Sequence, residues 1–490
     1  MIALAELQER IGYHFNDEKL LQTALTHSSY TREKNRTSQC NERLEFLGDA
    51  FFDAIIGEEL YKSFPDQEEG FLSRIRATIV CEKSLALKAA VIGLGEFIRI
   101  GKGEEKTGGR KSASPVLWTD MEKEYKLLII NPGSTSTKIS LFKNEQEVFQ
   151  RSQFHDAPVL LQFPHVNDQV PFRYQVILDL LKQEGVDPAE IDVFVGRGGS
   201  ACTQPSGVTT IDQKLYDDTE AAVGGSEHAA KLGVMLAWKF ALAYHRPAYT
   251  LNPTNVDEYC DYARLTGIRG LYRAGHSHVL NPKAVATAEA ESMGKRYEDC
   301  NFIVAHIDGG VTVSAHDHGR MIDGTMGADG EGPFAPTRIG SVPVLALLDY
   351  LETHPMEDVR RMCSRSGGFV SLFGTSNSDT IHALVDQGDK KATLVWNTMI
   401  YQICKHIGAM SAVLAGHVDA ILLTGGLMRF DDITAGIRER CGLIAPIHVY
   451  PGEMEQEAMA YPVLKVLRGQ AAAMTYSGKN VWQGFEGITF

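Results

Sequence analysis

The chain has 490 residues, with 48 Lys and Arg against 62 Asp and Glu and a formal net charge of −14. This length leaves room for more than one domain, and the negative charge argues against a protein that coats nucleic acid. The eight Cys form no CxxC pair and no zinc-ligand spacing, and the sequence shows no signal peptide and no apolar run of membrane-spanning length. We therefore expect a cytoplasmic protein with no membrane partner.

The first hundred residues show helical periodicity. Apolar residues recur at three- and four-residue intervals in two stretches: Leu4, Leu7 and Ile11, then Leu44, Leu47, Phe51 and Ile55. This pattern predicts an all-helical domain. In the second stretch Glu42, Glu45 and Asp49 fall on one helix face, where three carboxylates repel one another unless a cation such as Mg²⁺ is present. An exposed acidic stripe is the alternative explanation of the same spacing.

Four segments of this region resemble bacterial ribonuclease III in sequence and order. They read THSSY at 26–30, NERLEFLGDA at 41–50, EGFLSRIRA at 69–77 and GKGEEKTGGR at 101–110. The resemblance defines a domain over residues 1–115 and implies that the three carboxylates on the helix face belong to a metal cluster.

The ribonuclease III resemblance ends before that metal cluster is complete. The family continues with an Asp and, three residues later, a Glu, whereas here Asp120 is followed at that spacing by Lys123. Two-metal phosphodiester cleavage needs enough carboxylates to hold both ions. We expect a truncated domain with a vestigial cluster and little or no RNA cleavage, with RNA kept as an alternative partner.

Residues 116–124 form a junction between this domain and the next. Met121 lies immediately before the strand that opens the second domain, and the ribonuclease resemblance stops a few residues upstream. This arrangement fits a fusion of adjacent or rearranged reading frames.

The second domain, expected over residues 125–490, opens with a β-hairpin at 127–142. An apolar run, Leu127 to Ile130, enters a turn that contains Gly133, and an alternating strand returns from it. Exposed N–H groups in such a turn can cradle phosphate oxygens, and Lys138 supplies a point charge for a terminal phosphate. Because no helix follows at once, this is not a P-loop. An ordinary surface hairpin is the alternative.

A second hairpin, at 302–316, repeats this design with Asp308-Gly309-Gly310 at its turn. A third apolar strand, 420–424, ends in Gly425-Gly426, where bare backbone can approach an adenosine. Repetition of a phosphate-binding hairpin predicts a duplicated fold with a nucleotide between its halves.

Six segments of this region, in order, resemble the acetate and butyrate kinase family, and butyrate kinase in particular. They are INPGSTSTK at 130–138, VGRGG at 195–199, AHIDGG at 305–310, GEGPFAPTRIG at 330–340, LLTGG at 422–426 and YPGEMEQEAMA at 450–460. The resemblance implies two α/β lobes of the actin-like, sugar-kinase-like ATPase fold, the first beginning at the 127–142 hairpin and the second containing the 302–316 hairpin. It also implies ATP or ADP and Mg²⁺ as cofactors. The implied reaction is reversible phosphoryl transfer between ATP and butyrate that gives butanoyl phosphate.

The resemblance also implies roles for individual residues. Arg197 and Arg338 match the family's two active-site arginines, and a guanidinium fork suits the oxygens of a transferring phosphoryl group. His278 falls where the family has a histidine that stabilises the transition state. The phosphate and substrate side is lined by Asn131, Ser134, Ser136 and Lys138, and the β- and γ-phosphates lie against His306, Asp308, Gly309 and Gly310.

The family's Mg²⁺-associated glutamate falls within 450–460. Glu455 matches it best and Glu453 is the second choice, and either would leave most of the coordination to water and phosphate. Acetate kinases have an aspartate where this chain has Asn252. An amide can position a substrate but cannot act as a base, which argues mildly against strict acetate specificity.

Several alternatives stay open at this point. The acid can be isobutyrate or another branched-chain acid, propionate or acetate in place of butyrate. From another class, the chain can be an RNA-binding or RNA-processing protein whose C-terminal part is an ATP-dependent clamp. We also expect a homo-oligomer.

Overall fold

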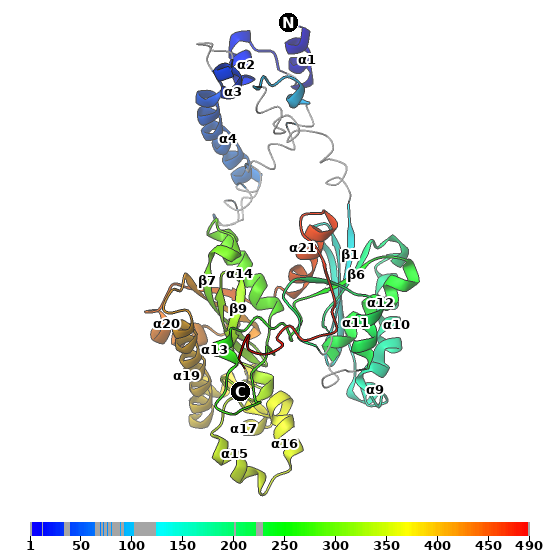
Figure 1. Cartoon of the computed structure of the whole chain (residues 1–490), viewed down its shortest axis with the longest axis vertical. Helices are drawn as coiled ribbons and strands as arrows, with labels where there is room; N and C mark the ends of the chain where they lie inside the picture. Colours follow the sequence, from blue (N-terminus) through cyan, green and yellow to red (C-terminus); the bar gives the residue numbers. More distant parts are fainter. Residues whose placement is uncertain are drawn as a thin grey trace. The chain divides into compact units, whose positions relative to one another are not determined.

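The computed structural model describes residues 2–11, 13–33, 40–63, 93–101 and the single residues 69, 72, 76, 80 and 89 in the N-terminal part, and residues 124–199, 202–221 and 229–488 in the remainder. The chain divides into two compact units, Met1–Lys123 and Glu124–Phe490 (Figure 1). Within the described ranges, every helix is too short or too polar to traverse a lipid bilayer.

The described part of the first unit is built from four helices. These are α1 (Ile2–Ile11), α2 (Glu18–Ala24), α3 (Ser28–Glu33) and α4 (Glu42–Ser63), and a short 3₁₀ turn follows at Leu94–Glu96. Leu4 and Leu7 of α1 pack against Leu21 and Leu25 in a small core. The described residues agree with the expected helices, while the all-helical character of the whole domain stays a prediction.

The first lobe of the second unit contains a seven-stranded sheet in the order β12-β5-β6-β4-β1-β2-β3. Its strands are β1 (Lys126–Pro132), β2 (Ser136–Lys143), β3 (Gln146–Phe154), β4 (Val193–Gly196), β5 (Val208–Thr210), β6 (Ala248–Leu251) and β12 (Met474–Thr475). Strands β1 and β2 pair in antiparallel register, with Asn131 opposite Lys138. The hairpin expected at 127–142 is therefore confirmed.

The second lobe contains a five-stranded sheet in the order β11-β10-β7-β8-β9. Its strands are β7 (Asn301–Ile307), β8 (Val311–Asp317), β9 (Arg320–Gly324), β10 (Ala420–Gly425) and β11 (Ile447–Pro451). Three antiparallel strands are followed by strands parallel to the first of them, as in the β3-β2-β1-β4-β6 portion of the other sheet. The duplication expected from the two hairpins is confirmed by this shared strand order.

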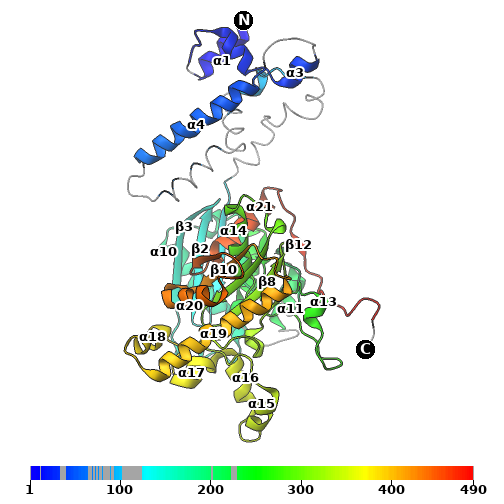
Figure 2. The ribbon, with the colours of Figure 1, turned by 90° about the vertical axis from the view of Figure 1, so that its left-hand side faces the viewer.

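Helices cover both faces of each sheet. On the outer faces lie α10 (Val170–Gln183) and α12 (Leu232–Tyr244) in the first lobe, and α19 (Lys390–Val413) and α20 (Asp431–Cys441) in the second. Between the sheets lie α14 (Leu280–Ser292) and α21 (Glu455–Leu467) (Figure 1). Figure 2 shows α19 and α20 in front of the second sheet.

The remaining helices are shorter and lie on connections. They are α9 (Ala157–Leu160), α11 (Gln213–Glu220), α13 (Asp261–Arg264), α15 (Val344–Leu351), α16 (Met356–Arg361), α17 (Gly368–Phe373) and α18 (Ser378–Asp386).

The apolar run of β1 shows why this strand occupies the centre of its sheet. Leu128 and Ile130 pack towards α10 and α12, while Leu127 and Ile129 pack towards α21. A strand buried on both faces needs a continuous apolar sequence. The run stops at Asn131, where the strand leaves the core, and the ends of β1, β4, β7 and β10 carry the polar residues described next.

Candidate active site

Arg197, Glu455 and Asn131 form a closed hydrogen-bonded set in the first lobe. The Arg197 guanidinium contacts Glu455 Oε1 at 2.5 Å and donates to Asn131 Oδ1 at 3.1 Å, while Asn131 Nδ2 donates to Glu455 Oε2 at 2.8 Å. The loop after β4 is anchored by the backbone N–H of Arg197, which donates to the Ile130 carbonyl at 2.9 Å. Both oxygens of the buried Glu455 carboxylate are thus engaged by protein groups.

His278 and His306 lie side by side, with ring centroids 4.4 Å apart. The carbonyl oxygen of the Asn281 side chain accepts from the backbone N–H of Met454 at 2.9 Å, which fixes the orientation of that amide. Its Nδ2 must then donate to His306 Nδ1, at 3.1 Å, and to Thr424 Oγ1, at 3.0 Å. His306 consequently carries its proton on Nε2, 3.6 Å from Glu453 Oε1.

Both histidines are neutral near pH 7. Burial lowers the pKa of His306 to about 4, with Arg197 and Arg338 acting in the same direction, although the carboxylates of Asp308 and Glu455 oppose them. Burial, followed by the charges of His306, Arg338 and Arg197, holds the pKa of His278 well below its usual value. His278 Nδ1 pairs with Thr312 Oγ1 at 2.8 Å, so the imidazole is held in place as an uncharged hydrogen-bonding group.

Arg338 is a half-buried cation whose Nε is buried. No carboxylate of the described residues pairs with its guanidinium, and its buried Nε has no hydrogen-bond partner there. Burial lowers the pKa of Arg338, and the negative charge of Asp329 opposes this shift. Gly310 is needed for this placement, because a Cβ at that position would lie 2.5 Å from the guanidinium carbon. A partly desolvated guanidinium without an ion-pair partner is suited to an anionic ligand.

The Asp308-Gly309-Gly310 turn meets Gly425 and Gly426 through Asp308. The Asp308 carboxylate accepts from the backbone N–H of Gly309 at 2.6 Å and of Gly426 at 2.8 Å. Gly425 has φ +105°, and a Cβ there would lie 2.3 Å from the Ile307 carbonyl oxygen. The structure therefore joins the second hairpin to the end of β10.

Glu453 is the carboxylate most perturbed by its surroundings. Burial, followed by the negative charges of Glu455 and Asp308, raises its pKa to about 7 against the opposing effect of Arg197 and Lys138. Across the described ranges, no group of three or more His, Cys, Asp or Glu side chains is arranged to hold a metal ion. A cation beside Glu453 would offset the repulsion among these carboxylates, and the structure fits Mg²⁺ held largely by water and phosphate.

Two sets of expected residues lie at the edge of this arrangement. Ser134 is exposed and Ser136 and Lys138 are half-buried around the first hairpin turn. Asn252 has φ +42°, and its Oδ1 accepts from the backbone N–H of Gly207 at 2.8 Å. The side chain of Asn252 therefore holds a neighbouring loop, and the contact with substrate expected for it stays a prediction.

The carboxylates expected to form the ribonuclease-like cluster lie in the other unit. Glu42 and Glu45 are exposed in the first turn of α4, while the side chain of Asp49 lies outside the described residues, as do Asp120 and Lys123.

Three residues of the site escape sequence reasoning: Asn281, Thr312 and Thr424. Asn281 fixes the His306 tautomer, Thr312 holds His278, and Thr424 donates to the Gly452 carbonyl at 3.1 Å. Thr424 lies within a quoted motif, Thr312 lies just after one and Asn281 lies three residues after His278, yet none carries a charge that would single it out. The sequence feature that could have identified them is their position, because all three are polar residues at the ends of buried strands or helices.

Comparison with known proteins gives separate matches for the N-terminal part and for the second unit of the chain. The family model described as "Ribonuclease-III-like" matches residues 17–122, and the one described as "Acetokinase family" matches residues 248–441. The structure is similar to Porphyromonas gingivalis acetate kinase, with 19% identity, 70% of this chain and 100% of that chain covered, and a TM-score of 0.58. A propionate kinase from Francisella tularensis subsp. tularensis gives 16% identity, coverage of 69% and 98%, and a TM-score of 0.57.

The nuclease domain of ribonuclease III from Campylobacter jejuni is 43% identical over 23% of this chain and 74% of that chain, with a TM-score of 0.21. The second unit has the two-lobed fold of the acetate kinase structure to which it is similar. More particularly, residues 248–441 match the acetate kinase family and residues 17–122 match a ribonuclease III-like domain.

Proposed function

We propose that the second unit is a carboxylate kinase that transfers a phosphoryl group reversibly between ATP and a short-chain fatty acid, and that butyrate is its preferred acid. The observation that carries the proposal is the half-buried guanidinium of Arg338, which forms no ion pair among the described residues, beside two neutral histidines and a second arginine. Such a site offers positive charge and hydrogen bonds without a strong base. This suits the transfer of a phosphoryl group to a carboxylate, which is already a nucleophile.

The two arginines have different environments and therefore different proposed roles. Arg197 is partly neutralised by Glu455, which holds its fork in a fixed orientation. Arg338 has no such ion-pair partner among the described residues, and only the more distant Asp329 acts on its charge, so the guanidinium is available to the oxygens of the transferring group. We assign to Arg338 the larger share of transition-state stabilisation, and to Arg197 the orientation of substrate and phosphoryl group.

His278 acts as a neutral hydrogen-bonding group. An imidazolium in this position would add a third positive charge beside Arg197 and Arg338, and these charges, together with burial, disfavour it. With Nδ1 paired to Thr312, the remaining ring nitrogen can contact an oxygen of the transferring phosphoryl group. No proton transfer is required, because the carboxylate substrate is ionised at neutral pH.

Mg²⁺ in this site would neutralise charge on the nucleotide phosphates. Glu453 is the carboxylate best suited to hold its water ligands, because both oxygens of Glu455 already bind Arg197 and Asn131. Asp308 would contribute negative charge from the second lobe. This reverses the order of preference that the sequence motif suggests for Glu455 and Glu453.

The test is formation of acyl phosphate, trapped as hydroxamate, from ATP and each of four acids at equal concentration: butyrate, isobutyrate, propionate and acetate. We expect turnover with all small acids and the highest kcat/KM with butyrate. A higher value for acetate or propionate would refute the butyrate assignment alone. Absence of product with every acid, from a protein that still binds ATP, would refute the carboxylate kinase assignment.

A further inference from the structure

Arg173 is a buried cation in the first lobe, and it lies outside the site described above. It belongs to α10 and is completely buried. Its Nη1 donates to the Ser136 carbonyl at 2.6 Å and to Thr137 Oγ1 at 3.2 Å, and its Nη2 donates to the Ser134 carbonyl at 3.3 Å. The guanidinium therefore holds the turn of the first hairpin from the side of the helix.

Every acceptor of the Arg173 guanidinium is uncharged. Its Nε donates to Gln169 Oε1 at 3.0 Å, and the remaining acceptors are backbone carbonyls and a hydroxyl. In the described part of the chain no carboxylate forms an ion pair with it. Burial lowers the pKa of Arg173 to about 10, so the side chain stays charged at neutral pH. A full positive charge is therefore held behind the turn without neutralisation.

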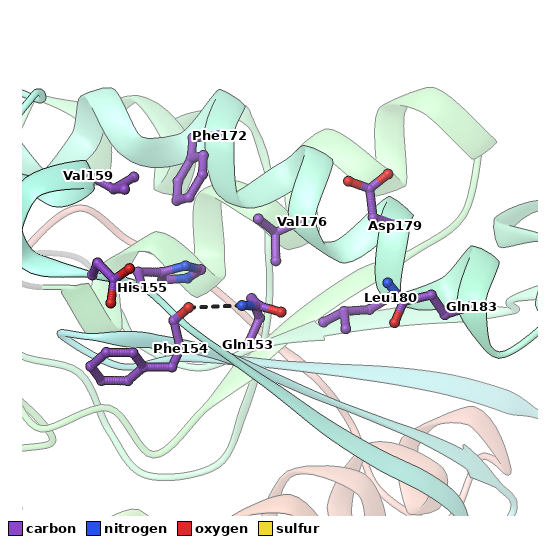
Figure 3. A pocket seen from close by; sticks show the side chains of 10 residues that line it. Gln153, Phe154, His155, Val159, Phe172, Val176, Asp179, Leu180 and Gln183 are labelled. Carbon is purple, nitrogen blue, oxygen red and sulfur yellow. Dashed lines mark hydrogen bonds between the residues drawn. The ribbon is translucent and has the colours of Figure 1, made fainter.

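Thr137 also connects Arg173 to His155. Thr137 Oγ1 accepts from Arg173 and pairs with His155 Nε2 at 2.8 Å, and burial and the Arg173 charge lower the pKa of His155. His155 lines a cavity of about 370 Å³ between the end of β3 and α10 (Figure 3). Asp179 lines the same cavity but accepts from Gln175 at 3.0 Å.

The opposite side of the turn is open. The carbonyls of Ser134 and Ser136 accept from Arg173, whereas the backbone N–H groups of Ser134 and Thr135 find no acceptor among the described residues. The Ser134 carbonyl shares its peptide unit with the N–H of Thr135, so the guanidinium bound to that carbonyl polarises the unit and strengthens the Thr135 N–H as a donor. One side of the turn therefore presents backbone N–H donors, and the positive charge of Arg173 lies on the other side. This combination suits the binding of an anion.

We infer that Arg173 is a positioning residue that supplies, through the turn at 133–137, the counter-charge for the nucleotide phosphates. It touches no substrate; it holds the turn in shape and makes it electropositive. The inference deepens the proposed function by assigning the source of phosphate affinity in the first lobe. It depends on nucleotide binding and not on which acid is phosphorylated.

The test compares the binding of ATP with that of adenosine by calorimetry, without any acid. Hydrogen bonds that involve a charged group contribute enough to change affinity about tenfold or more. For Arg173→Gln we expect ATP affinity to fall by about tenfold or more, while adenosine affinity stays unchanged. A variant that merely loosens the fold would weaken both ligands alike, so the ratio of the two affinities separates an electrostatic role from a structural one.

A second variant neutralises the charge without removing the guanidinium. Gln169→Glu has nearly the same shape, and a carboxylate against Arg173 Nε would keep the hydrogen bond and stay ionised beside the cation. We expect Q169E to melt no lower than the natural chain and still to lose ATP affinity relative to adenosine. The control is Arg151→Gln, which removes an exposed charge of β3 paired with Glu184 and should change neither affinity.

The outcomes are distinct. Selective loss of ATP affinity in both R173Q and Q169E supports the inference. Unchanged ATP binding in Q169E, or equal loss of ATP and adenosine in R173Q, overturns it. If R173Q does not fold, Q169E decides alone. Because binding is measured without an acid, failure of the acyl phosphate assay would refute the proposed reaction and leave this result standing.

Discussion

Replacement of Arg338 by Gln separates catalysis from stability. Arg338 is half-buried, its buried Nε has no partner among the described residues, and none of their carboxylates forms an ion pair with it. Burial lowers the pKa of Arg338 and Asp329 opposes this shift only from a distance, so in the free protein the partly desolvated charge contributes little to folding. Gln is uncharged and smaller, and Gly310 beneath it leaves the side chain free to adapt.

The two expected effects of R338Q have opposite signs. Removal of an arginine that stabilises phosphoryl transfer lowers kcat roughly 10³-fold or more, which corresponds to about 4 kcal/mol of transition-state free energy. Removal of a partly desolvated charge that has no ion-pair partner leaves the melting temperature unchanged or raises it. Lys at this position keeps the charge but lacks the fork, so R338K should fall between R338Q and the natural chain in turnover.

The assay is hydroxamate-trapped acyl phosphate under saturating ATP and butyrate, with thermal melting of the same preparations. Arg296→Gln is the matched control, because Arg296 is exposed and paired with Asp299 three residues away, and its loss should change neither quantity. Turnover of R338Q within tenfold of the natural chain would refute the assigned role. A large drop in melting temperature would refute the claim that the charge contributes little to folding.

Three further predictions concern other parts of the chain. A chain that starts at Met121 should keep full kinase activity, because every residue of the proposed site lies beyond it; loss of soluble protein or of turnover would show a shared core. Neither the full chain nor Asp49→Asn should cleave duplex RNA above background with Mg²⁺, and cleavage that disappears in D49N would make the chain bifunctional. Glu453 has a pKa raised to about 7, so the folded state binds its proton more tightly than the unfolded state does. Without Mg²⁺ the melting temperature should therefore fall as pH rises from about 4.5 to 7. In E453Q, measured over the same range, the part of this fall that comes from Glu453 should be absent. Equal dependence of melting temperature on pH in E453Q and the natural chain would contradict the assignment.

Sequence patterns predict the local elements of the second unit well. The run from Leu127 to Ile130 specifies a doubly buried strand, and the residues after Gly133 specify its return. The duplication of the hairpin predicts the shared strand order of the two sheets. These strands and turns are determined by residues that are close together in the sequence, so the amino-acid pattern alone is enough to predict them.

Long-range polar contacts are not accessible in the same way. Glu455 is the better motif match for Mg²⁺, yet its oxygens bind Arg197 and Asn131, residues more than 250 positions away. Arg173 reads as an ordinary helix residue until its burial behind the first turn is known. The specificity for one acid and the oligomeric state stay predictions, because both depend on surfaces that no local pattern defines.

The return of the chain end to the first lobe has a consequence for synthesis. Helix α21 packs on the inner face of the first sheet, and β12 adds its last strand. About 300 residues separate β3 from α21, so a ribosome working at about 5 to 20 residues per second needs roughly 15 to 60 s to supply the missing helix. During that interval Leu127 and Ile129 lack their native cover. The nascent first lobe is therefore a substrate for chaperones, and C-terminal truncation should trap it in that state.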